Sequence, residues 1–354
     1  MDVAIVGAGI GGLAFARALE LRSIRCTVYE QRNRYARSGL GLLLLPNGLA
    51  ALDALGLGDE VRALSNPLDL AVIRTSAGVP LGQYRLQGHR GIARMDLMGP
   101  LQTAVPETVV RFEAPFEGLL GEAPLRARVG GVEVQPDLLV AADGSRSSVR
   151  SVVAPEWRLE PCPVSELVSV CVAPDLAALY DRTFLKSMAT GERLAVGLVP
   201  GAFGKIVWFV QFDAREVGQV PTGSSAKREF VRQLVGHWAD PIPELVERTD
   251  FTHTHLWVTP SPARPPAMVH GRVVLIGDAA HPFPTLTSQG ANAALEDAVA
   301  LARHLSEGPS IDEALAAFEA ERRPRLEEIR VGGQALLDSF LSADSSSLLP
   351  LVDV

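Results

Sequence analysis

A glycine-rich turn close to the N-terminus limits the possible folds of this chain more than any other feature. Gly7, Gly9 and Gly12 stand between an apolar, β-branched run, Asp2–Val6, and a helical pattern, Leu13–Leu21. In such a turn the first glycine permits the reversal, the second lets the backbone approach a pyrophosphate, and the third allows the helix to pack closely. The positive end of the helix dipole would face the phosphates. The pattern therefore predicts a dinucleotide-binding βαβ unit.

The second strand of this unit ends in an acid. Cys26–Glu30 has the pattern of an extended segment, and Glu30 stands eighteen positions after Gly12, close to the roughly 20 typical of an acid that accepts hydrogen bonds from ribose hydroxyls. An acid here disfavours a ribose 2′-phosphate in the same site. The alternative is a glycine-rich turn that binds nothing, but a strand, a helix and an acid in register make that alternative the weaker one.

Length and charge exclude several other classes of protein. With 354 residues, the chain is long enough for one large domain and a smaller partner. Its net charge of −8 is spread along the chain and leaves no basic stripe, so we expect no nucleic-acid partner. The longest apolar stretch, Leu40–Leu57, is interrupted by Pro46, Asn47 and Asp53, so we expect no transmembrane segment.

The N-terminus and the cysteines favour the cytoplasm. The chain begins directly with a strand pattern and shows neither the basic region nor the cleavage pattern of a secretory signal. Cys26, Cys162 and Cys171 are odd in number and widely spaced, which suits a reducing compartment better than a disulfide framework. His253 and His255 could be two metal ligands, but no carboxylate or cysteine completes a set, so we expect no metal site.

Strand and helix patterns fill most of the remaining chain. In chain order they predict a glycine- and leucine-rich loop before Asn47, a helical stretch Asn47–Ala63, antiparallel strands over Pro67–Arg85, a β-meander of Val109–Glu113, Leu125–Val129 and Val132–Val134, a buried strand Leu138–Ala142, a strand-rich region Pro161–Phe212, a buried strand Val273–Ile276 and a helical end Asn292–Phe340. In the strand-rich region, Trp208, Val210 and Phe212 share one face. These three side chains either line a substrate cavity or pack in the core.

Two further segments have polar residues just after a buried strand. In the first, Asp143 and Gly144 follow the strand and precede hydroxyl residues that can start a helix. In the second, Asp278 follows the Val273–Ile276 strand, where its carboxylate can accept a hydrogen bond from a sugar hydroxyl, and His281 would brace the turn. Backbone N–H groups around Gly290 could face an electron-rich carbonyl. Each segment alone could also be an ordinary turn or a helix cap.

Together and in this order, the three segments resemble the FAD-dependent aromatic hydroxylases of the para-hydroxybenzoate hydroxylase family, also called group A flavoprotein monooxygenases. The resemblance covers nearly the whole chain and includes Gly41, Pro46-Asn47, Arg94-x-Asp96-Leu97 and Phe318-Glu-Ala-Glu-Arg322-Arg-Pro324; its most specific part is Gly277-Asp278 followed by Glu296-Asp297-Ala298. It implies an α/β fold, with a Rossmann-like FAD-binding domain and a second, smaller antiparallel-sheet substrate domain. The FAD-binding domain would be discontinuous, over residues 1–66, 89–153 and 262–340; the substrate domain would take 67–88 and 154–261, and 341–354 would form a tail.

The cofactor contacts of the family carry over to matching positions of this sequence. Glu30 would bind the adenosine ribose, Arg94 would lie along the FAD, and Asp278 would hold its ribityl or pyrophosphate region. The implied cofactor-binding residues are Gly7, Gly9, Ile10, Gly12, Glu30, Gly41, Arg94, Asp143, Gly144, Asp278, Gly290, Ala291 and Asn292. The last three would sit against the flavin ring, and Asp143-Gly144 matches the motif associated with both FAD and NAD(P)H.

Two positions beside the expected flavin face depart from the family pattern. The usual Pro-Pro after the histidine becomes Pro284-Thr285, and the usual Gly-Gln-Gly becomes Ser288-Gln289-Gly290. A nucleotide-binding scaffold without turnover is therefore kept as an alternative.

The resemblance implies a monooxygenase in which NADH or NADPH reduces FAD and one oxygen atom of O2 is transferred to a small, apolar, aromatic or polyketide-like substrate. The cofactor carries the difficult chemistry, so no catalytic side chain is assigned; Arg37 and Pro284 are the candidates. A halogenase or a prenyl-chain reductase is the alternative within the flavoenzymes. The four tryptophans never form the Trp-x-Trp pair of typical halogenases, which disfavours the first of these.

Overall fold

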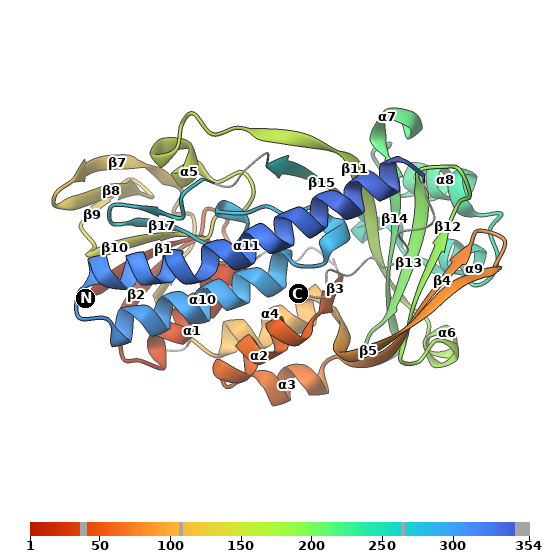
Figure 1. The fold of residues 1–354 in the computed structure, drawn as a ribbon, viewed down its shortest axis with the longest axis horizontal. Coiled ribbons are helices and arrows are strands. Elements are labelled where there is room, and N and C mark those ends of the chain that lie inside the picture. Colours follow the sequence, from red (N-terminus) through yellow and green to blue (C-terminus); the bar gives the residue numbers. More distant parts are fainter. Residues whose placement is uncertain (36–40, 106–108, 263–265, 344–354) are drawn as a thin grey trace.

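Two large β-sheets dominate the computed structural model, which describes residues 1–35, 41–105, 109–262 and 266–343. The first sheet lies on the left of Figure 1 and the second on the right. The first has the strand order β16-β17-β10-β1-β2-β6. Its strands are β1 (Asp2–Val6), β2 (Arg25–Tyr29), β6 (Val109–Arg111), β10 (Leu138–Ala141), β16 (Val269–His270) and β17 (Val273–Leu275). All of its pairs are parallel except β16 with β17. This parallel sheet confirms the predicted α/β class.

Helices cover the first sheet because each of them has an apolar face. In α1 (Ile10–Glu20), Leu13, Phe15 and Leu19 are fully buried. The helix α10 (Gly290–Glu307) packs against both α1 and the long α11 (Ile311–Leu341), which runs from the first sheet to the second (Figure 1). The remaining helices on this side are α2 (Pro46–Ala54), α3 (Gly58–Ala63), α4 (Arg94–Thr103) and α5 (Ser148–Val153).

The second sheet has eight strands, in the order β15-β11-β14-β13-β12-β4-β5-β3. They are β3 (Gly41–Leu44), β4 (Asn66–Thr75), β5 (Pro80–Ala93), β11 (Leu159–Val172), β12 (Thr183–Met188), β13 (Leu194–Pro200), β14 (Lys205–Asp213) and β15 (His255–Pro262). Only β12 with β4 is a parallel pair. The rest pair antiparallel, as the sequence predicts for the 67–85 and 161–212 regions.

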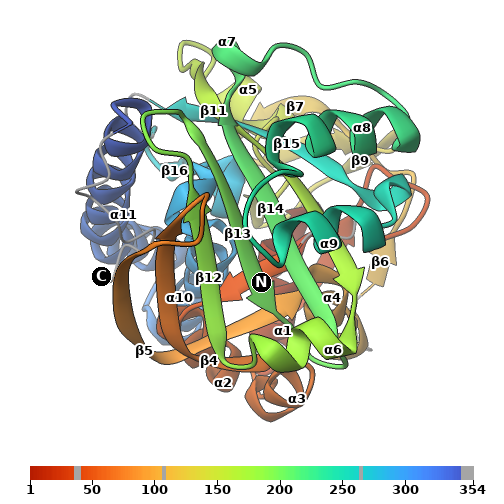
Figure 2. The same ribbon diagram turned by 90° about the vertical axis from the view of Figure 1, so that its right-hand side faces the viewer.

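The two faces of the second sheet have different surroundings. The outer face carries Leu167, Trp208 and Val210 and packs against the helices α8 (Ser224–Val235) and α9 (Ile242–Arg248), which lie in front of the sheet in Figure 2. The inner face carries alternate residues of the same strands, such as Val168, Phe184 and Val207, and is turned toward the first sheet (Figure 1). Short elements complete this part: α6 (Pro174–Leu179), α7 (Ala214–Val217) and the 3-10 turn η1 (Phe251–His253).

Two predicted elements are wrong in detail. The segment Val109–Arg111 is not part of a meander but pairs in parallel with β2 in the first sheet. The three-stranded sheet instead begins with β7 (Phe116–Glu122) and continues with β8 (Leu125–Val129) and β9 (Val132–Val134); a turn at Gly130-Gly131 joins β8 to β9. The predicted loop before Asn47 contains strand β3, because the tertiary pairing with β5 satisfies its backbone groups.

Candidate active site

Four strands of the first sheet end side by side and deliver the predicted cofactor motifs to one edge. The parallel registers pair β1 with β2 and β10, and β10 with β17. Each motif begins within two residues of a strand end: Gly7 after β1, Glu30 after β2, Asp143 after β10 and Gly277 after β17. Because carboxyl ends of parallel strands share one edge, segments far apart in sequence converge there, and such an edge is where open α/β sheets bind ligands.

The glycines of the first turn are required by its geometry. Gly7 has a φ of +104°, and a Cβ placed on it would lie 2.4 Å from the Ala142 carbonyl oxygen. A Cβ on Gly12 would lie 2.0 Å from the carbonyl oxygen of Gly7. Gly9, the N-cap residue before Ile10 in α1, has no atom of the described residues within 4 Å of the same position. The turn is therefore tight at its first and third glycines and open at its second, where a phosphate can approach.

Glu30 is fixed by the loops beside it. Its carboxylate accepts hydrogen bonds from the backbone N–H of Ala8 at 3.0 Å and of Arg32 at 3.0 Å. The acid of the second strand and the dinucleotide turn are thus bound directly to each other. This arrangement holds the carboxylate at the sheet edge, where ribose hydroxyls can donate to it.

Arg150 joins the second and third motifs. Its guanidinium donates to the carbonyl oxygen of Ala279 at 2.7 Å, to that of Asp278 at 3.2 Å and to that of Ser145. Asp143 has one oxygen engaged, since Oδ2 accepts from the Ser148 backbone at 2.8 Å, while Oδ1 is buried with no partner among the described residues. In the sequence, Arg150 stands near the start of a helix. Only the fold shows that its side chain joins the Ser145 segment to the Asp278–Ala279 turn.

Two partly buried charges lie at the same edge. Loss of solvation raises the pKa of the Asp278 carboxyl, and this effect is opposed by His281, Arg150 and Arg94. Burial likewise lowers the pKa of the Arg94 guanidinium, which also feels the charges of Arg32 and Asp278. Arg94 Nη1 is buried without a partner in the described part of the chain. An unpartnered buried donor of this kind is costly unless a ligand satisfies it.

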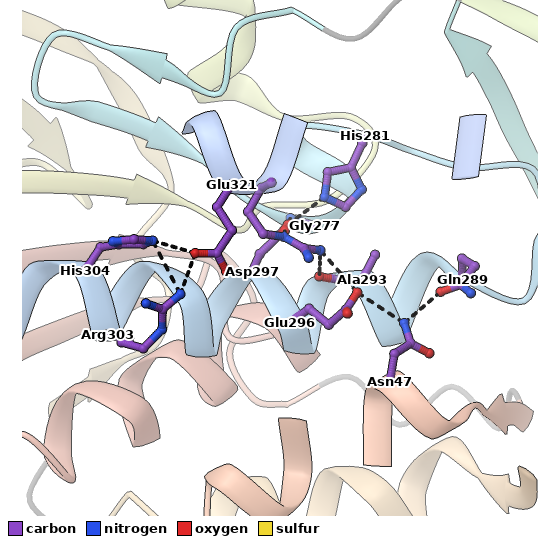
Figure 3. Close-up of polar contacts among 11 residues, drawn as sticks. Asn47, Gly277, His281, Gln289, Ala293, Glu296, Asp297, Arg303, His304 and Glu321 are labelled. Atoms are coloured by element: carbon purple, nitrogen blue, oxygen red, sulfur yellow. Dashed lines mark hydrogen bonds and ion pairs between the residues drawn. The ribbon is translucent and has the colours of Figure 1, made fainter. Parts of the chain in front are cut away.

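A buried network holds the Gly277-Asp278 turn against α10 (Figure 3). Asp297 Oδ2 accepts from the Gly277 backbone at 2.9 Å and from His281 Nε2 at 2.6 Å, and its Oδ1 accepts from Arg322 Nε at 2.8 Å. Burial alone would raise the pKa of Asp297, but His281 and Arg322 outweigh it and lower the pKa to about 2. His281 also stacks on Phe283. His281 therefore braces the turn, as predicted, and does so through Asp297.

The first turn of α10 presents the predicted flavin-side residues. Gly290 begins the helix, and its Cβ position would lie 3.6 Å from Asp278 Oδ1. The side chain of Asn292 is already occupied: it accepts from the Leu45 backbone at 3.1 Å and donates to the carbonyl oxygens of Leu43 and Ser288. Asn292 thus ties β3 to α10, which leaves backbone N–H groups of Gly290 and Ala291 to face a ligand.

A second contact joins α2 to the same helix. Asn47 Nδ2 donates to Gln289 Oε1 at 3.0 Å and to Glu296 Oε2 at 3.1 Å, as Figure 3 shows. Gly41, at the start of β3, has no room for a side chain, because a Cβ there would lie 1.9 Å from a methyl group of Val207. Gly41 therefore permits close approach of β3 to β14 of the same sheet.

Both departures from the family pattern have a visible consequence. Ser288 adopts the left-handed conformation, with φ of 54° and ψ of 13°, which glycine accepts more readily than serine. Thr285, at the start of the 3-10 turn η3 (Thr285–Thr287), acts on the carboxyl of Glu166 and lowers its pKa, against the stronger effect of burial. Pro284 is the residue directly before this turn, and the preceding element in the chain is the 3-10 turn η2 (Gly277–Ala279).

The structure does not bring every sequence candidate to this edge. Trp208, Val210 and Phe212 lie on the outer face of the second sheet, in one core with α8 and α9, and Trp208 Nε1 donates to Thr249 Oγ1 at 2.9 Å. Their surroundings match core packing, the other possibility that the sequence left open. Arg37 lies outside the described residues.

Sequence reasoning missed three polar residues on the inner face of the second sheet: Glu166, Lys186 and Gln211, all buried. The available signal was a charged or amide side chain at an alternating position within an otherwise apolar strand. In the described part of the chain, no helix combines the length and apolar character needed to cross a bilayer. Among the same residues, no group of three His, Cys, Asp or Glu side chains is arranged to hold a metal ion.

The site fits an extended dinucleotide. Arg94 Nη1 and Asp143 Oδ1 lack partners, and the Cβ positions of Gly9 and Gly144 have no atom within 4 Å among the described residues. A nucleotide with a pyrophosphate and several hydroxyls would supply acceptors for the first and donors for the second. Fold and site together define an FAD-binding flavoprotein oxidoreductase.

The comparisons with known proteins name the family. The profile described as FAD binding domain matches residues 1–330, and the chain belongs to the FAD-dependent aromatic hydroxylases of the para-hydroxybenzoate hydroxylase family. It is 33% identical to aurachin C monooxygenase/isomerase of Stigmatella aurantiaca over 94% of this chain and 88% of the relative. It is 32% identical to 3-amino-4-hydroxybenzoate 2-monooxygenase of Streptomyces cremeus over 96% and 87%.

A solved structure has the same fold. HpxO of Klebsiella pneumoniae complexed with FAD and uric acid superposes with a TM-score of 0.85, at 24% identity, over 99% of this chain and 90% of that one. These findings confirm the predicted fold class, the FAD cofactor and the monooxygenase class.

Proposed function

We propose that this FAD-dependent monooxygenase uses NADH or NADPH and O2 to hydroxylate or epoxidise a small aromatic or polyketide-like substrate. The observation that carries the proposal is the convergence of Gly7, Glu30, Asp143 and Asp278 at one edge of the first sheet. The relatives support it, since the names of two of them describe monooxygenases of aromatic compounds: 3-amino-4-hydroxybenzoate 2-monooxygenase and salicylate hydroxylase of Pseudomonas putida.

The side chains of the edge would divide the work of holding the cofactor. Glu30 would accept from the adenosine ribose, Arg94 would donate along the nucleotide, and Asp278 would accept from its ribityl or pyrophosphate region. The backbone at Gly290 and Ala291 would face the flavin ring. FAD, when bound, accepts electrons from the reduced nicotinamide and activates O2. The protein's contribution is to orient the cofactor and the substrate and to exclude water.

We also propose the domain organisation that the sequence indicates. Residues 1–66, 89–153 and 262–340 would form the FAD-binding domain, and 67–88 and 154–261 the substrate domain. The strands β11 to β15 support this division, because all of them lie in the second sheet. Strand β3 and the end of β5 also extend that sheet into segments assigned to the first domain.

Reconstitution with FAD tests the proposal. The purified protein should be yellow, should bleach when NADH or NADPH is added without oxygen, and should recover its colour in air. Reduced nicotinamide should be consumed faster when a substrate from a panel of phenols and heteroaromatic compounds is present. A colourless protein that takes up no added FAD would refute the proposal. Tight FAD binding without reduction would favour a scaffold without turnover.

A further inference from the structure

Two oppositely charged side chains are buried on the inner face of the second sheet, and the cofactor site uses neither. Glu166 of β11 is 6% exposed and Lys186 of β12 is 4% exposed. Their charges act on each other, yet their charged atoms do not come within the 4.0 Å of an ion pair. Buried opposite charges gain most when they touch. Their separation indicates that a further polar group belongs between or beside them.

The two residues interrupt apolar surface in the same way. Along β11, Glu166 stands between Val164 and Val168, and along β12, Lys186 stands between Phe184 and Met188. The flanking residues belong to two different apolar clusters. One contains Val168, Phe184, Val207 and Leu43, with Phe209 packed against it, and the other contains Val164, Ala195, Leu286 and Leu337, with Met188 packed against it. The inner face is therefore apolar on both sides of a polar stripe.

Two neighbours hold the carboxylate of this stripe in place. Gln211, paired with Glu166 across the β11–β14 ladder, donates from Nε2 to Glu166 Oε1. The Thr285 side chain in η3 acts on the same carboxylate and lowers its pKa. The family pattern has proline at the position of Thr285, and proline has no hydroxyl to donate. The departure from the pattern beside the expected flavin face thus makes a specific contact with the second sheet.

The stripe has unmet hydrogen-bonding capacity. Gln211 Oε1 is buried and has no partner among the described residues. Within the same part of the chain, Lys186 donates no hydrogen bond and interacts with Glu166 only through space. An ammonium has three N–H donors, and an amide oxygen is an acceptor. A ligand that satisfies both must carry an anionic or strongly accepting oxygen and also an O–H or N–H group.

We propose that Lys186 and Gln211, positioned with the help of Glu166, bind the substrate, and that the substrate is an aromatic acid: a ring with an anionic oxygen group for Lys186 and an O–H or N–H donor for Gln211. The inference rests on the proposed function and names the substrate class of that site. The apolar clusters on both sides of the stripe would contact the ring, and the polar stripe would set its orientation.

The protonation state of the lysine supports this assignment. Burial lowers the pKa of Lys186 to about 8, and the charge of Glu166 opposes the decrease. Lys186 is therefore mostly protonated at neutral pH and can attract an anion. Glu166, on β11 and separated from β12 by β14 and β13, is the charged group that acts on it. Anion binding should weaken as the pH rises above about 8.

Equilibrium binding to the oxidised FAD-loaded protein tests the assignment without turnover. The probes are 3-hydroxybenzoate, 3-hydroxybenzamide, which lacks the anion, and 3-methoxybenzoate, which lacks the O–H donor; binding is followed by the flavin absorbance spectrum and by calorimetry. Wild-type protein should bind 3-hydroxybenzoate at least about 10-fold more tightly than either analogue, as expected for one charge-assisted hydrogen bond.

Two variants assign the contacts to individual residues. Lys186→Met should weaken both carboxylates by about 10- to 100-fold and leave the carboxamide unchanged. Gln211→Met should weaken 3-hydroxybenzoate but not 3-methoxybenzoate. Lys227→Met is the matched control, because Lys227 lies on α8 at the outer face, where it donates to the Thr254 carbonyl oxygen. This control should bind all three probes as the wild type does.

The wild-type comparison alone can overturn the inference, even if a variant fails to fold. Equal affinity for the carboxylate and the carboxamide, or no binding of any of the three probes, would refute it. A protein that holds FAD and bleaches with NADPH but does not discriminate between the probes refutes the substrate class alone. A protein that holds no FAD refutes the proposed function instead.

Discussion

Replacing Asp297 by asparagine should test how the fold supports the cofactor edge. The carboxylate accepts from Gly277, His281 and Arg322 at 2.9, 2.6 and 2.8 Å, and an asparagine amide would turn N–H groups toward at least one of these donors. The pKa of Asp297 falls from 3.8 to about 2. At about 1.36 kcal/mol per pKa unit, this corresponds to about 2.4 kcal/mol. Leaving Arg322 buried without its partner adds to the loss, so we expect destabilisation of about 3–5 kcal/mol.

Urea unfolding of the FAD-free protein at pH 7 measures this loss. Asp312→Asn is the control, since Asp312 is 73% exposed and pairs only with Arg272 among the described residues; it should change the free energy of unfolding by less than about 1 kcal/mol. Because the folded pKa of Asp297 lies below the unfolded one, its contribution is present above about pH 4 and is lost as the pH falls toward 2. FAD affinity should also fall in Asp297→Asn, because the Gly277 turn loses its anchor.

A loss below about 1 kcal/mol, or one equal to that of the control, would refute this account of the network. The account would also be refuted if the difference in free energy of unfolding between the wild type and Asp297→Asn did not shrink as the pH falls from 4 toward 2. In either case, packing between α10 and α11 would hold the turn without the carboxylate.

Three further predictions concern single residues. Gly12→Ala should destabilise the protein by about 2 kcal/mol or more and abolish FAD binding, since its Cβ would meet the Gly7 carbonyl oxygen at 2.0 Å; Gly9→Ala, with open space at its Cβ, should keep its unfolding midpoint and lose only FAD affinity. Arg94→Met should lower FAD affinity at least about 10-fold in a flavin titration without destabilising the FAD-free protein, because Nη1 has no partner in the described chain; unchanged affinity would contradict the role given to it. Lys186→Met should stabilise the protein by up to about 3 kcal/mol at pH 7, since the pKa decrease from 10.5 to about 8 reflects a buried charge. This gain should shrink between pH 8 and 10.5, because the unfolded lysine there retains a proton that the folded one has lost, and the wild type becomes more stable. Guanidinium unfolding of both proteins at pH 7 and pH 10 measures the change. An equal stability difference at the two pH values would contradict the reasoning.

The local sequence determined the cofactor motifs and the elements that carry them. Gly7, Gly12 and Glu30 are specified by the requirements of one turn and one strand end, which involve residues close together in the chain. Strand β10 and the helices α1 and α10 were predicted for the same reason. The predicted meander wrongly included Val109–Arg111, because the strand pattern of this segment fits either sheet. Only its pairing with β2 assigns it to the first sheet. Strand β3 was missed because pairing with β5 outweighs a sequence that resembles a loop.

Tertiary structure alone decided which side chains face one another across the molecule. Alternation along β14 separates Trp208 from Gln211, but it does not say which face the helices α8 and α9 cover. The meeting of Glu166 with Thr285, and the network that joins Asp297 to Arg322, depend on contacts between distant segments. Sequence periodicity reports which residues share a face, whereas burial and the partner of each charge are set by how the faces are packed together. The proposed site therefore has a cofactor side that could be deduced from the sequence and a proposed substrate side whose residues only the fold brings together.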